Sequence, residues 1–274
     1  MSAIAATFRD LKQKSDGGLI AYVMAGDPTL KHTLQIVDAL VAGGADIVEL
    51  GIPFSDPIAD GPTLQRAAWR ALEAGTTPKK VFDVARAIRR AHEVPLVVMT
   101  YYNIVHQMGV EAFCSAAEQS GVNGVIAPDL PFEEASSYKE AAMRHGLDTI
   151  FLVAPSTSAA RLEKLVTASS GFVYLVSANG ITGARKILQD ESVASIQRTA
   201  SLIRGRAPLA VGFGLSLSSH VRQVINSGAS AAIVGSRFAE IVEQSLDDEH
   251  AMLKGIRECA HTLKGGTLPS GRAD

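Results

Sequence analysis

Apolar residues recur along the chain in a fixed relation to glycine. An alanine-rich amphipathic segment ends in a small residue followed by glycine, and a short apolar run follows closely; the four instances end at Gly44, Gly121, Gly171 and Gly228. Glycine suits the left-handed position that closes a helix. Short continuous apolar runs are typical of strands covered on both faces. Each instance therefore predicts a helix, a turn and a buried strand.

Further apolar runs raise the number of strand candidates to about eight, most of them about 25 to 30 residues apart, the length of a βα unit. The added runs lie at 19–24, 95–101, 149–153 and 208–211. This spacing predicts the α/β class and a closed (β/α)8 TIM barrel. A doubly wound open sheet is the alternative, but its usual Gly-x-Gly-x-x-Gly turn does not follow the first run.

Two helices interrupt the regular spacing. Residues 4–14 predict a helix ahead of the first strand, with Ile4, Phe8 and Leu11 on one face, and such a helix could close the bottom of a barrel. Residues 63–74 and 78–92 predict two helices between the second and third strands, with Thr77 as the cap of the second one. We therefore expect an extra N-terminal helix and an extra helix after strand 2.

The rest of the chain offers no internal linker, so residues 1–274 are expected to form a single (β/α)8-barrel domain. The segment from Asp247 is expected to extend the last helix to about Leu263. The glycine-rich, polar residues from Lys264 onward are expected to be frayed.

Composition narrows the possible functions. The formal net charge of -2, without a basic stripe, argues against nucleic acid as a partner. No apolar stretch approaches the ~20 residues that span a bilayer, and no targeting segment is evident, so a cytoplasmic location is expected. The two cysteines, Cys114 and Cys259, lack metal-ligand spacing, and no metal site is predicted.

Glu49 is the first candidate for chemistry. In a barrel of this kind the working groups lie at the carboxyl ends of the strands. Alternation along the second strand places Glu49 on the same face as Ile47, facing the barrel mouth. Partial desolvation there would raise the pKa of a glutamate, as a group that both gives and takes a proton requires. A structural alternative is a carboxylate that caps a loop or pairs with a lysine.

The loop after this strand, residues 51–62, carries three prolines and two more carboxylates, Asp56 and Asp60. Prolines stiffen a loop, so this one could hold Asp60 opposite Glu49, or it could present Pro53 and Phe54 to another protein. A turn-forming role ahead of Gly61 is the alternative for Asp60.

Late in the chain, glycine-rich turns follow the sixth, seventh and eighth strands. Phosphate sites in such barrels recur after strands 7 and 8, where backbone N–H groups converge on an anion. The turns predict a phosphate ligand held at Gly183, Gly214, Gly235 and Ser236, although each turn taken singly could be a plain loop. Residues 178–192 resemble a lid.

Several apolar or amphipathic residues near strand ends are suited to holding an aromatic ring, although core packing is the alternative for each one: Met99, Tyr101, Leu152 and Tyr174.

Distinctive motifs cover nearly the whole chain, and the longest is the run from Glu49 to Pro57, which continues through residues 59–62. The others are Gly26-Asp27-Pro28, Met99-Thr100-Tyr101-Tyr102-Asn103, Pro128-Asp129-Leu130-Pro131, Tyr174-Leu175-Val176-Ser177, Gly180-Ile181-Thr182-Gly183, Gly212-Phe213-Gly214 and Gly235-Ser236. With these motifs the chain resembles the tryptophan synthase α-chain family, and the run from Glu49 looks like the signature of that family.

The resemblance implies retro-aldol cleavage of indole-3-glycerol phosphate to indole and glyceraldehyde 3-phosphate, with Glu49 as general acid/base and Asp60 accepting a hydrogen bond from the indole N–H. It also implies a PLP-dependent β subunit that joins indole to serine, an α2β2 tetramer, and no cofactor in this chain. Tyr22 and Thr182 are expected to join the residues that contact the substrate. Residues expected to face the β subunit are Pro53, Phe54, Asp56, Asn103 and Asp129.

The sequence departs from the family pattern at one place, and two alternative functions remain. Many members of the family carry an arginine after the serine matching Ser177, whereas Ala178 and Asn179 stand here. A different phosphate-sugar barrel enzyme is one alternative, although no lysine or cysteine is evident at a strand end. The other is a barrel that has lost catalysis and only binds a partner, which the carboxylate pair argues against.

Overall fold

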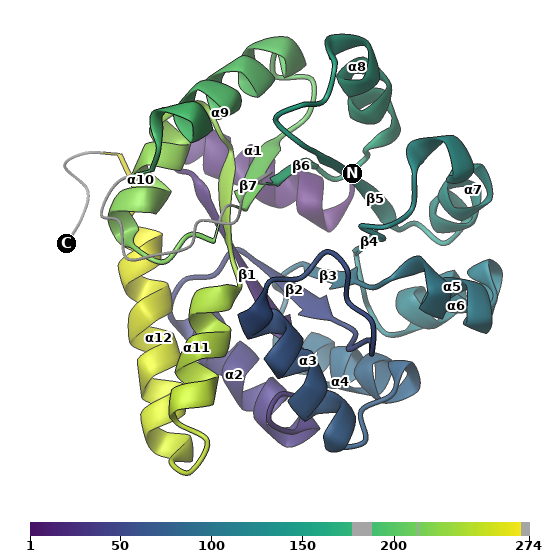
Figure 1. The fold of residues 1–274 in the computed structure, drawn as a ribbon, viewed down its shortest axis with the longest axis vertical. Helices are drawn as coiled ribbons and strands as arrows, with labels where there is room; N and C mark the ends of the chain where they lie inside the picture. Colours follow the sequence, from purple (N-terminus) through teal and green to yellow (C-terminus); the bar gives the residue numbers. More distant parts are fainter. Residues whose placement is uncertain (177–187, 213, 270–274) are drawn as a thin grey trace.

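The strands close into a barrel, as the spacing predicted. The computed structural model describes residues 1–176, 188–212 and 214–269. These contain eight parallel strands, each paired with the next, and the last with the first (Figure 1). Their bounds are β1 Gly18–Met24, β2 Ile47–Gly51, β3 Leu96–Met99, β4 Gly124–Ile126, β5 Asp148–Val153, β6 Val173–Val176, β7 Leu209–Gly212 and β8 Ala231–Val234. The open-sheet alternative is wrong.

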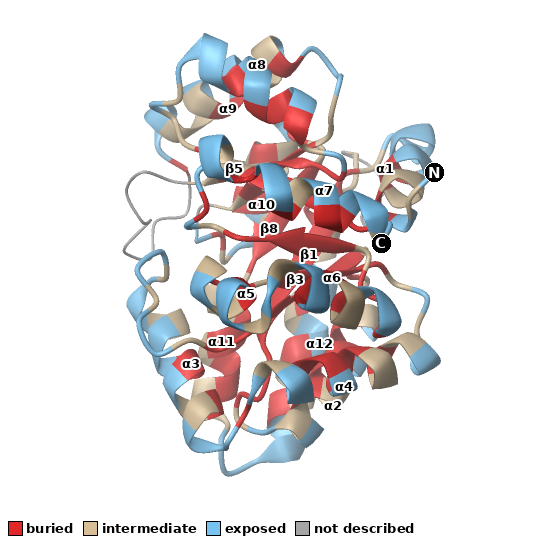
Figure 2. Cartoon of the chain, turned by 90° about the vertical axis from the view of Figure 1, so that its right-hand side faces the viewer, coloured by how far each residue is buried: buried red, intermediate tan, exposed pale blue. Residues whose placement is uncertain are grey.

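Helices surround the strands. The outer face of each helix is exposed to solvent, while the strands are buried (Figure 2). Burial on both faces is why the strands read as continuous apolar runs rather than as alternating ones. The helices are α1 Ala3–Lys14, α2 Leu30–Ala42, α3 Pro62–Glu73, α4 Pro78–Ala91, α5 Tyr102–Met108, α6 Val110–Gln119, η1 Phe132–Glu134, α7 Ser136–Arg144, α8 Ala159–Ala168, α9 Asp190–Ile203, α10 Ser218–Asn226, α11 Ser236–Gln244 and α12 Glu249–Gly265.

The barrel interior is filled by side chains from alternate strand positions. Ile4 and Phe8 of α1 pack into the same cluster, so the N-terminal helix closes the bottom of the barrel as expected. The Ser2 hydroxyl begins this helix by accepting from the N–H of Ala5. The strand residues of the cluster are Ile20, Ile47, Val97, Ile126, Ile150, Phe172, Ala210, Ala231 and Ile233.

The extra helix after strand 2 is also confirmed. The α4 helix begins at Pro78, and the Thr77 hydroxyl accepts from the N–H of Lys80, as the sequence indicated. The α3 helix ahead of it follows the loop that carries Asp60.

The C-terminal expectation was wrong in part. Helical structure does reach Gly265, near the expected end at Leu263, but it is not a continuation of the last barrel helix, and residues 270–274 of the segment expected to be frayed lie outside the described residues. The last barrel helix ends at Gln244, and α12 is a separate helix whose first turn is capped by Asp248, which accepts from the N–H of Ala251. Lys264 is not frayed either, because its ammonium group pairs with Asp46 at 2.7 Å. Thr267 is buried.

Within residues 1–176, 188–212 and 214–269, no helix is both long and apolar enough to cross a membrane. The same residues contain no group of three or more histidine, cysteine, aspartate or glutamate side chains placed to hold a metal ion.

Candidate active site

Glu49 faces the barrel interior near the carboxyl end of β2, where alternation from Ile47 placed it. Its register partners are Tyr22 on β1 and Val97 on β3. The side chain is fully buried, and neither carboxyl oxygen has a hydrogen-bond partner among the described residues. Burial, and secondarily the charge on Asp60, raises the pKa of Glu49 to about 8. Glu49 therefore carries a proton at neutral pH and can give it to a substrate.

Asp60 lies close enough to Glu49 to affect its ionisation. It lies near the end of the loop between β2 and α3 and is half-buried. The Gln65 side-chain amide donates to the Asp60 carbonyl oxygen at 2.8 Å, which ties the loop to the first turn of α3. Burial raises the pKa of the Asp60 carboxyl, and a hydrogen bond from Tyr101 opposes that effect. Two carboxyl groups in different surroundings thus meet at the mouth.

Tyr101 anchors the loop from the end of β3. Its hydroxyl accepts from the N–H of Ala59 at 2.9 Å and donates to Asp60. Its ring stacks on Phe54, with ring centroids 5.2 Å apart and an interplanar angle of 29°. Tyr101 thus contacts the loop near both of its ends and fixes where Asp60 sits.

Two more tyrosines flank Glu49. Burial raises the pKa of Tyr22 well above its ordinary range, and the charges of Asp60 and Glu49 add to this effect. The pKa of Tyr174 is raised by burial and then by the same two carboxyl groups. Both phenols therefore stay neutral. Met99 and Leu152 are half-buried and pack against the barrel interior. The sequence pattern placed Met99, Tyr101, Leu152 and Tyr174 near strand ends, Tyr22 was expected from the family resemblance alone, and the structure brings these residues together around Glu49.

Two glycines that were not predicted as site residues make room for these rings. A Cβ on Gly51 would come 2.1 Å from the Tyr22 hydroxyl oxygen, and one on Gly212 would come 2.7 Å from that of Tyr174. Real Cβ atoms do not approach so closely, so an alanine at either position would require the tyrosine ring to move. Gly51 stands two residues after Glu49 on the same strand face, and that alternation was the available signal.

The described part of the predicted phosphate site lies after β7 and β8. Gly235 directly precedes α11, and Ser236 is the first residue of that helix. The first turn of α11 carries no acidic residue that would repel an anion. Gly214 is exposed and has a φ of 65°, which favours glycine. Thr182 and Gly183 lie outside the described residues, as do Ala178 and Asn179.

The residues expected to face a partner differ in their exposure. Asp56, Asn103 and Asp129 are exposed, Phe54 is half-buried against Tyr101, and Pro53 is buried. The Asp129 carboxylate accepts from the N–H of Tyr102 at 2.8 Å, which joins the loops after β3 and β4. Asp129 also lines a cavity of about 250 Å³ beside the mouth.

Comparison with known proteins shows the family of this chain. The model of the family described as "Tryptophan synthase alpha chain" matches residues 8–267. Among curated proteins, the tryptophan synthase alpha chain of Methanosarcina mazei is 46% identical over 265 residues, which cover 97% of this chain and 94% of that protein. The alpha chain of Solibacter usitatus is 47% identical, over 90% of this chain and 91% of that protein.

Solved structures agree as well. The tryptophan synthase alpha chain of Legionella pneumophila superposes with a TM-score of 0.90 at 31% identity and covers 99% of both chains. A chain from the tryptophan synthase α2β2 complex of Pyrococcus furiosus gives a TM-score of 0.85 at 39% identity, over 91% of this chain and 98% of that one. The chain therefore belongs to the tryptophan synthase α-chain family.

Proposed function

We propose that this protein cleaves indole-3-glycerol phosphate to indole and glyceraldehyde 3-phosphate. The observation that carries the proposal is Glu49, a fully buried glutamate at the barrel mouth whose pKa is raised to about 8. An acid of this strength is suited to donate a proton to carbon and take one back near neutral pH. Family membership supplies the substrate, and Asp60 supplies the second carboxyl group that the cleavage needs.

The proton balance is as follows. Glu49 donates its proton to C3 of the indole ring, which makes the ring cationic, and Asp60 accepts a hydrogen bond from the ring N–H and stabilises that charge. Glu49, now a carboxylate, takes the proton of the glycerol hydroxyl next to the ring. The bond between that carbon and C3 breaks, its electron pair returns to the ring, and the carbon becomes the aldehyde. Glu49 ends protonated, as it began.

The remaining site residues hold the two ends of the substrate in this proposal. The indole ring contacts the side chains around Glu49, namely Tyr22, Met99, Tyr101, Leu152 and Tyr174, and by family resemblance also Thr182. The phosphate is held by Gly214, Gly235 and Ser236, and by resemblance Gly183. A backbone amide at the start of α11 is a natural donor to an anion.

We further propose that the chain works as one barrel domain in an α2β2 complex in the cytoplasm, and passes indole to a β subunit that carries the pyridoxal phosphate. The chain itself needs no cofactor in this scheme. The support is the Pyrococcus furiosus relative, which is described as an α2β2 complex. The face that meets the β subunit would include Pro53, Phe54, Asp56, Asn103 and Asp129.

Indole release from indole-3-glycerol phosphate tests the proposal. We expect slow release by the purified chain alone and faster release with a β subunit. Glu49→Gln should abolish release under both conditions, because glutamine cannot donate the proton. Absence of release by the unmodified chain under both conditions would overturn the proposed activity.

A further inference from the structure

Two helices carry the two ends of the site and lie side by side. The α3 helix begins two residues after Asp60, and α11 begins at Ser236 in the predicted phosphate site. They pack against each other on the outside of the barrel (Figure 1). A shift of either helix would therefore move one end of the site relative to the other.

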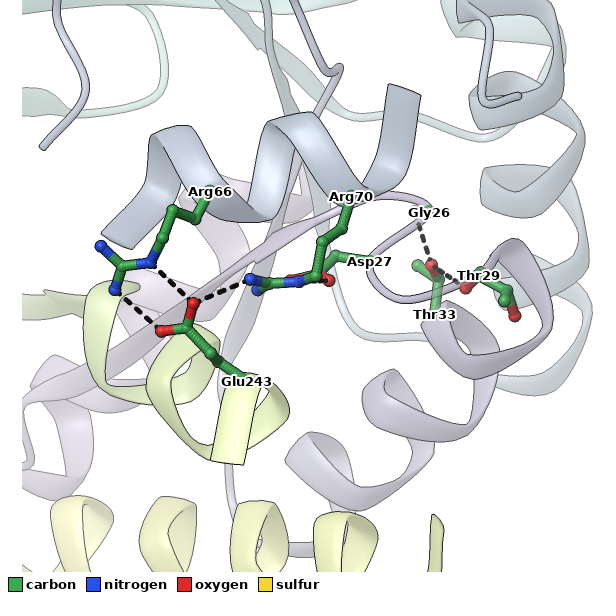
Figure 3. A network of polar contacts seen from close by, with 7 residues as sticks. All are labelled: Gly26, Asp27, Thr29, Thr33, Arg66, Arg70 and Glu243. Carbon is green, nitrogen blue, oxygen red and sulfur yellow. Dashed lines mark hydrogen bonds and ion pairs between the residues drawn. The ribbon is translucent and has the colours of Figure 1, made fainter. Parts of the chain in front are cut away.

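A network of charged side chains joins these helices (Figure 3). Arg70 of α3 donates two hydrogen bonds to Asp27, at 2.8 and 2.9 Å, and a third to Glu243 of α11, at 3.0 Å. Arg66, one turn earlier on α3, forms a second forked pair with Glu243, at 2.6 and 2.8 Å. Paired hydrogen bonds of this kind fix orientation as well as distance.

The inner end of the network is buried and held by the loop after β1. Asp27 is 3% exposed. The N–H of its neighbour Gly26 donates to the Thr33 hydroxyl at 2.8 Å, and that hydroxyl donates to the carbonyl of Thr29 at 3.1 Å. Arg70 is therefore anchored to the barrel through Asp27, while Glu243 connects it to α11. Arg66 lies at the exposed edge, and its contacts within the network are with Glu243.

Tyr22 forms a second, apolar connection beneath the network. It belongs to one cluster with the alanines of α3 and Ala239 of α11, and the α3 members are Ala67, Ala68 and Ala71. Its ring also lies against Gly235, since a Cβ there would come within 3.0 Å of it. The ring beside Glu49 thus contacts the residue that precedes α11.

We propose that Arg70 and Glu243 are positioning residues that couple the phosphate end of the site to the indole end. An anion held at the start of α11 stabilises one placement of that helix. The Arg70–Glu243 ion pair transmits this placement to α3 and to the Asp60 loop. Indole and a phosphate ester should then bind cooperatively, each increasing the affinity for the other by the same factor. The inference rests on the proposed function.

Calorimetric titration of indole, with and without saturating glycerol 3-phosphate, measures this factor. We expect indole to bind the wild-type protein about fivefold more tightly when glycerol 3-phosphate is present. Glu243→Leu removes the carboxylate on α11 that accepts from Arg70. The ratio of the indole affinities with and without glycerol 3-phosphate should then be close to one, while indole and glycerol 3-phosphate each still bind alone. Glu243→Gln keeps an acceptor and the side-chain shape, and should restore part of the ratio.

Arg66→Leu is the matched control, because it breaks the other ion pair of Glu243 and leaves Arg70 in place. The ratio of indole affinities in this variant should equal that of the wild type. Circular dichroism checks the fold of each variant, and if Glu243→Leu does not fold, a reduced ratio in Glu243→Gln takes its place. A ratio of one in the wild type, or an unchanged ratio in the Glu243 variants, overturns the coupling. Failure of both probes to bind the wild type would instead contradict the proposed function.

Discussion

The Glu49 carboxyl group lies in the barrel interior beside tyrosine side chains, and burial raises its pKa to about 8. Protonation of indole C3 needs the neutral acid, so kcat/KM for indole release should fall as the pH rises through about 8. A pH profile from about 6 to 10 tests this expectation. A profile that stays level through this range would contradict the role of Glu49 as the acid.

The same residue makes stability depend on pH. A glutamate in an unfolded chain ionises near 4.5, whereas Glu49 in the folded protein keeps its proton up to about 8. Between these values the folded state binds more protons than the unfolded state, so the free energy of unfolding decreases as pH rises, and the loss is complete above 8. Glu49→Gln cannot ionise and escapes this loss.

We therefore expect Glu49→Gln to be more stable than the wild type at pH 9, by about 2 to 4 kcal/mol given ~1.4 kcal/mol per pKa unit, and similar to it near pH 4.5. Urea denaturation at the two pH values measures the difference. Glu73→Gln, a change at an exposed position, is the control and should show no such pH-dependent gain. Equal stability of Glu49→Gln and wild type at pH 9 would contradict the raised pKa.

The close packing of the Tyr22 ring against Gly51 can be tested by substitution. Since a Cβ there would come 2.1 Å from the Tyr22 hydroxyl, Gly51→Ala must push that ring aside. Overpacking of this kind costs about 1 to 3 kcal/mol of stability. Adding Tyr22→Leu to Gly51→Ala should recover part of the loss, because the shorter side chain leaves room for the methyl group. Urea denaturation of the single and double variants measures this recovery, and purely additive losses would exclude the contact.

At the scale of elements, the loop from β2 to α3 depends on Tyr101. Tyr101→Phe keeps the stack on Phe54 but removes the hydrogen bonds to Ala59 and Asp60. The hydrogen bond lowers the pKa of Asp60, so its loss should raise that pKa. The acid limb of the kcat profile should then move to higher pH, and kcat should fall by about tenfold or more. Tyr102→Phe, at the next position, is the control and should leave the profile unchanged.

Local signals predicted most elements correctly. Small residues and glycines followed by apolar runs predicted the barrel, and the Thr77-Pro78 pair predicted the start of α4. The left-handed closing glycine is present at Gly44, Gly121 and Gly228 but not at Gly171, because α8 ends in an extended residue at Ser169. The break between α11 and α12 was missed, because the amphipathic pattern continues across it and Asp248 is an acidic residue in a charged stretch. A cap in such surroundings is recognised from its hydrogen bond rather than from its residue type.

The site was predicted in part. Strand alternation placed Glu49 at the mouth, whereas Asp60 and its proximity to Glu49 followed only from family resemblance. The Asp27–Arg70–Glu243 network could not be predicted, since its members lie 43 and 173 positions apart, and neither the motif that contains Asp27 nor the charges of Arg70 and Glu243 indicate that they pair. Contacts of this kind depend on which helices the barrel brings together, and local pattern carries no information about that.

At the scale of the whole molecule, residues at the bottom of the barrel contribute to stability, whereas residues at its mouth carry the chemistry. Ile4 of α1 is fully buried against the interior cluster, at the end opposite to Glu49. Ile4→Ala would leave a cavity there and should lower the free energy of unfolding by about 2 to 4 kcal/mol. At a temperature where the variant remains folded, kcat and KM should match the wild type, because the residues around Glu49 and Asp60 keep their contacts. Denaturation and indole-release assays on the same preparation test both statements. A stable variant with altered KM would mean that α1 influences the mouth through the interior cluster, and that the two ends of the barrel are coupled.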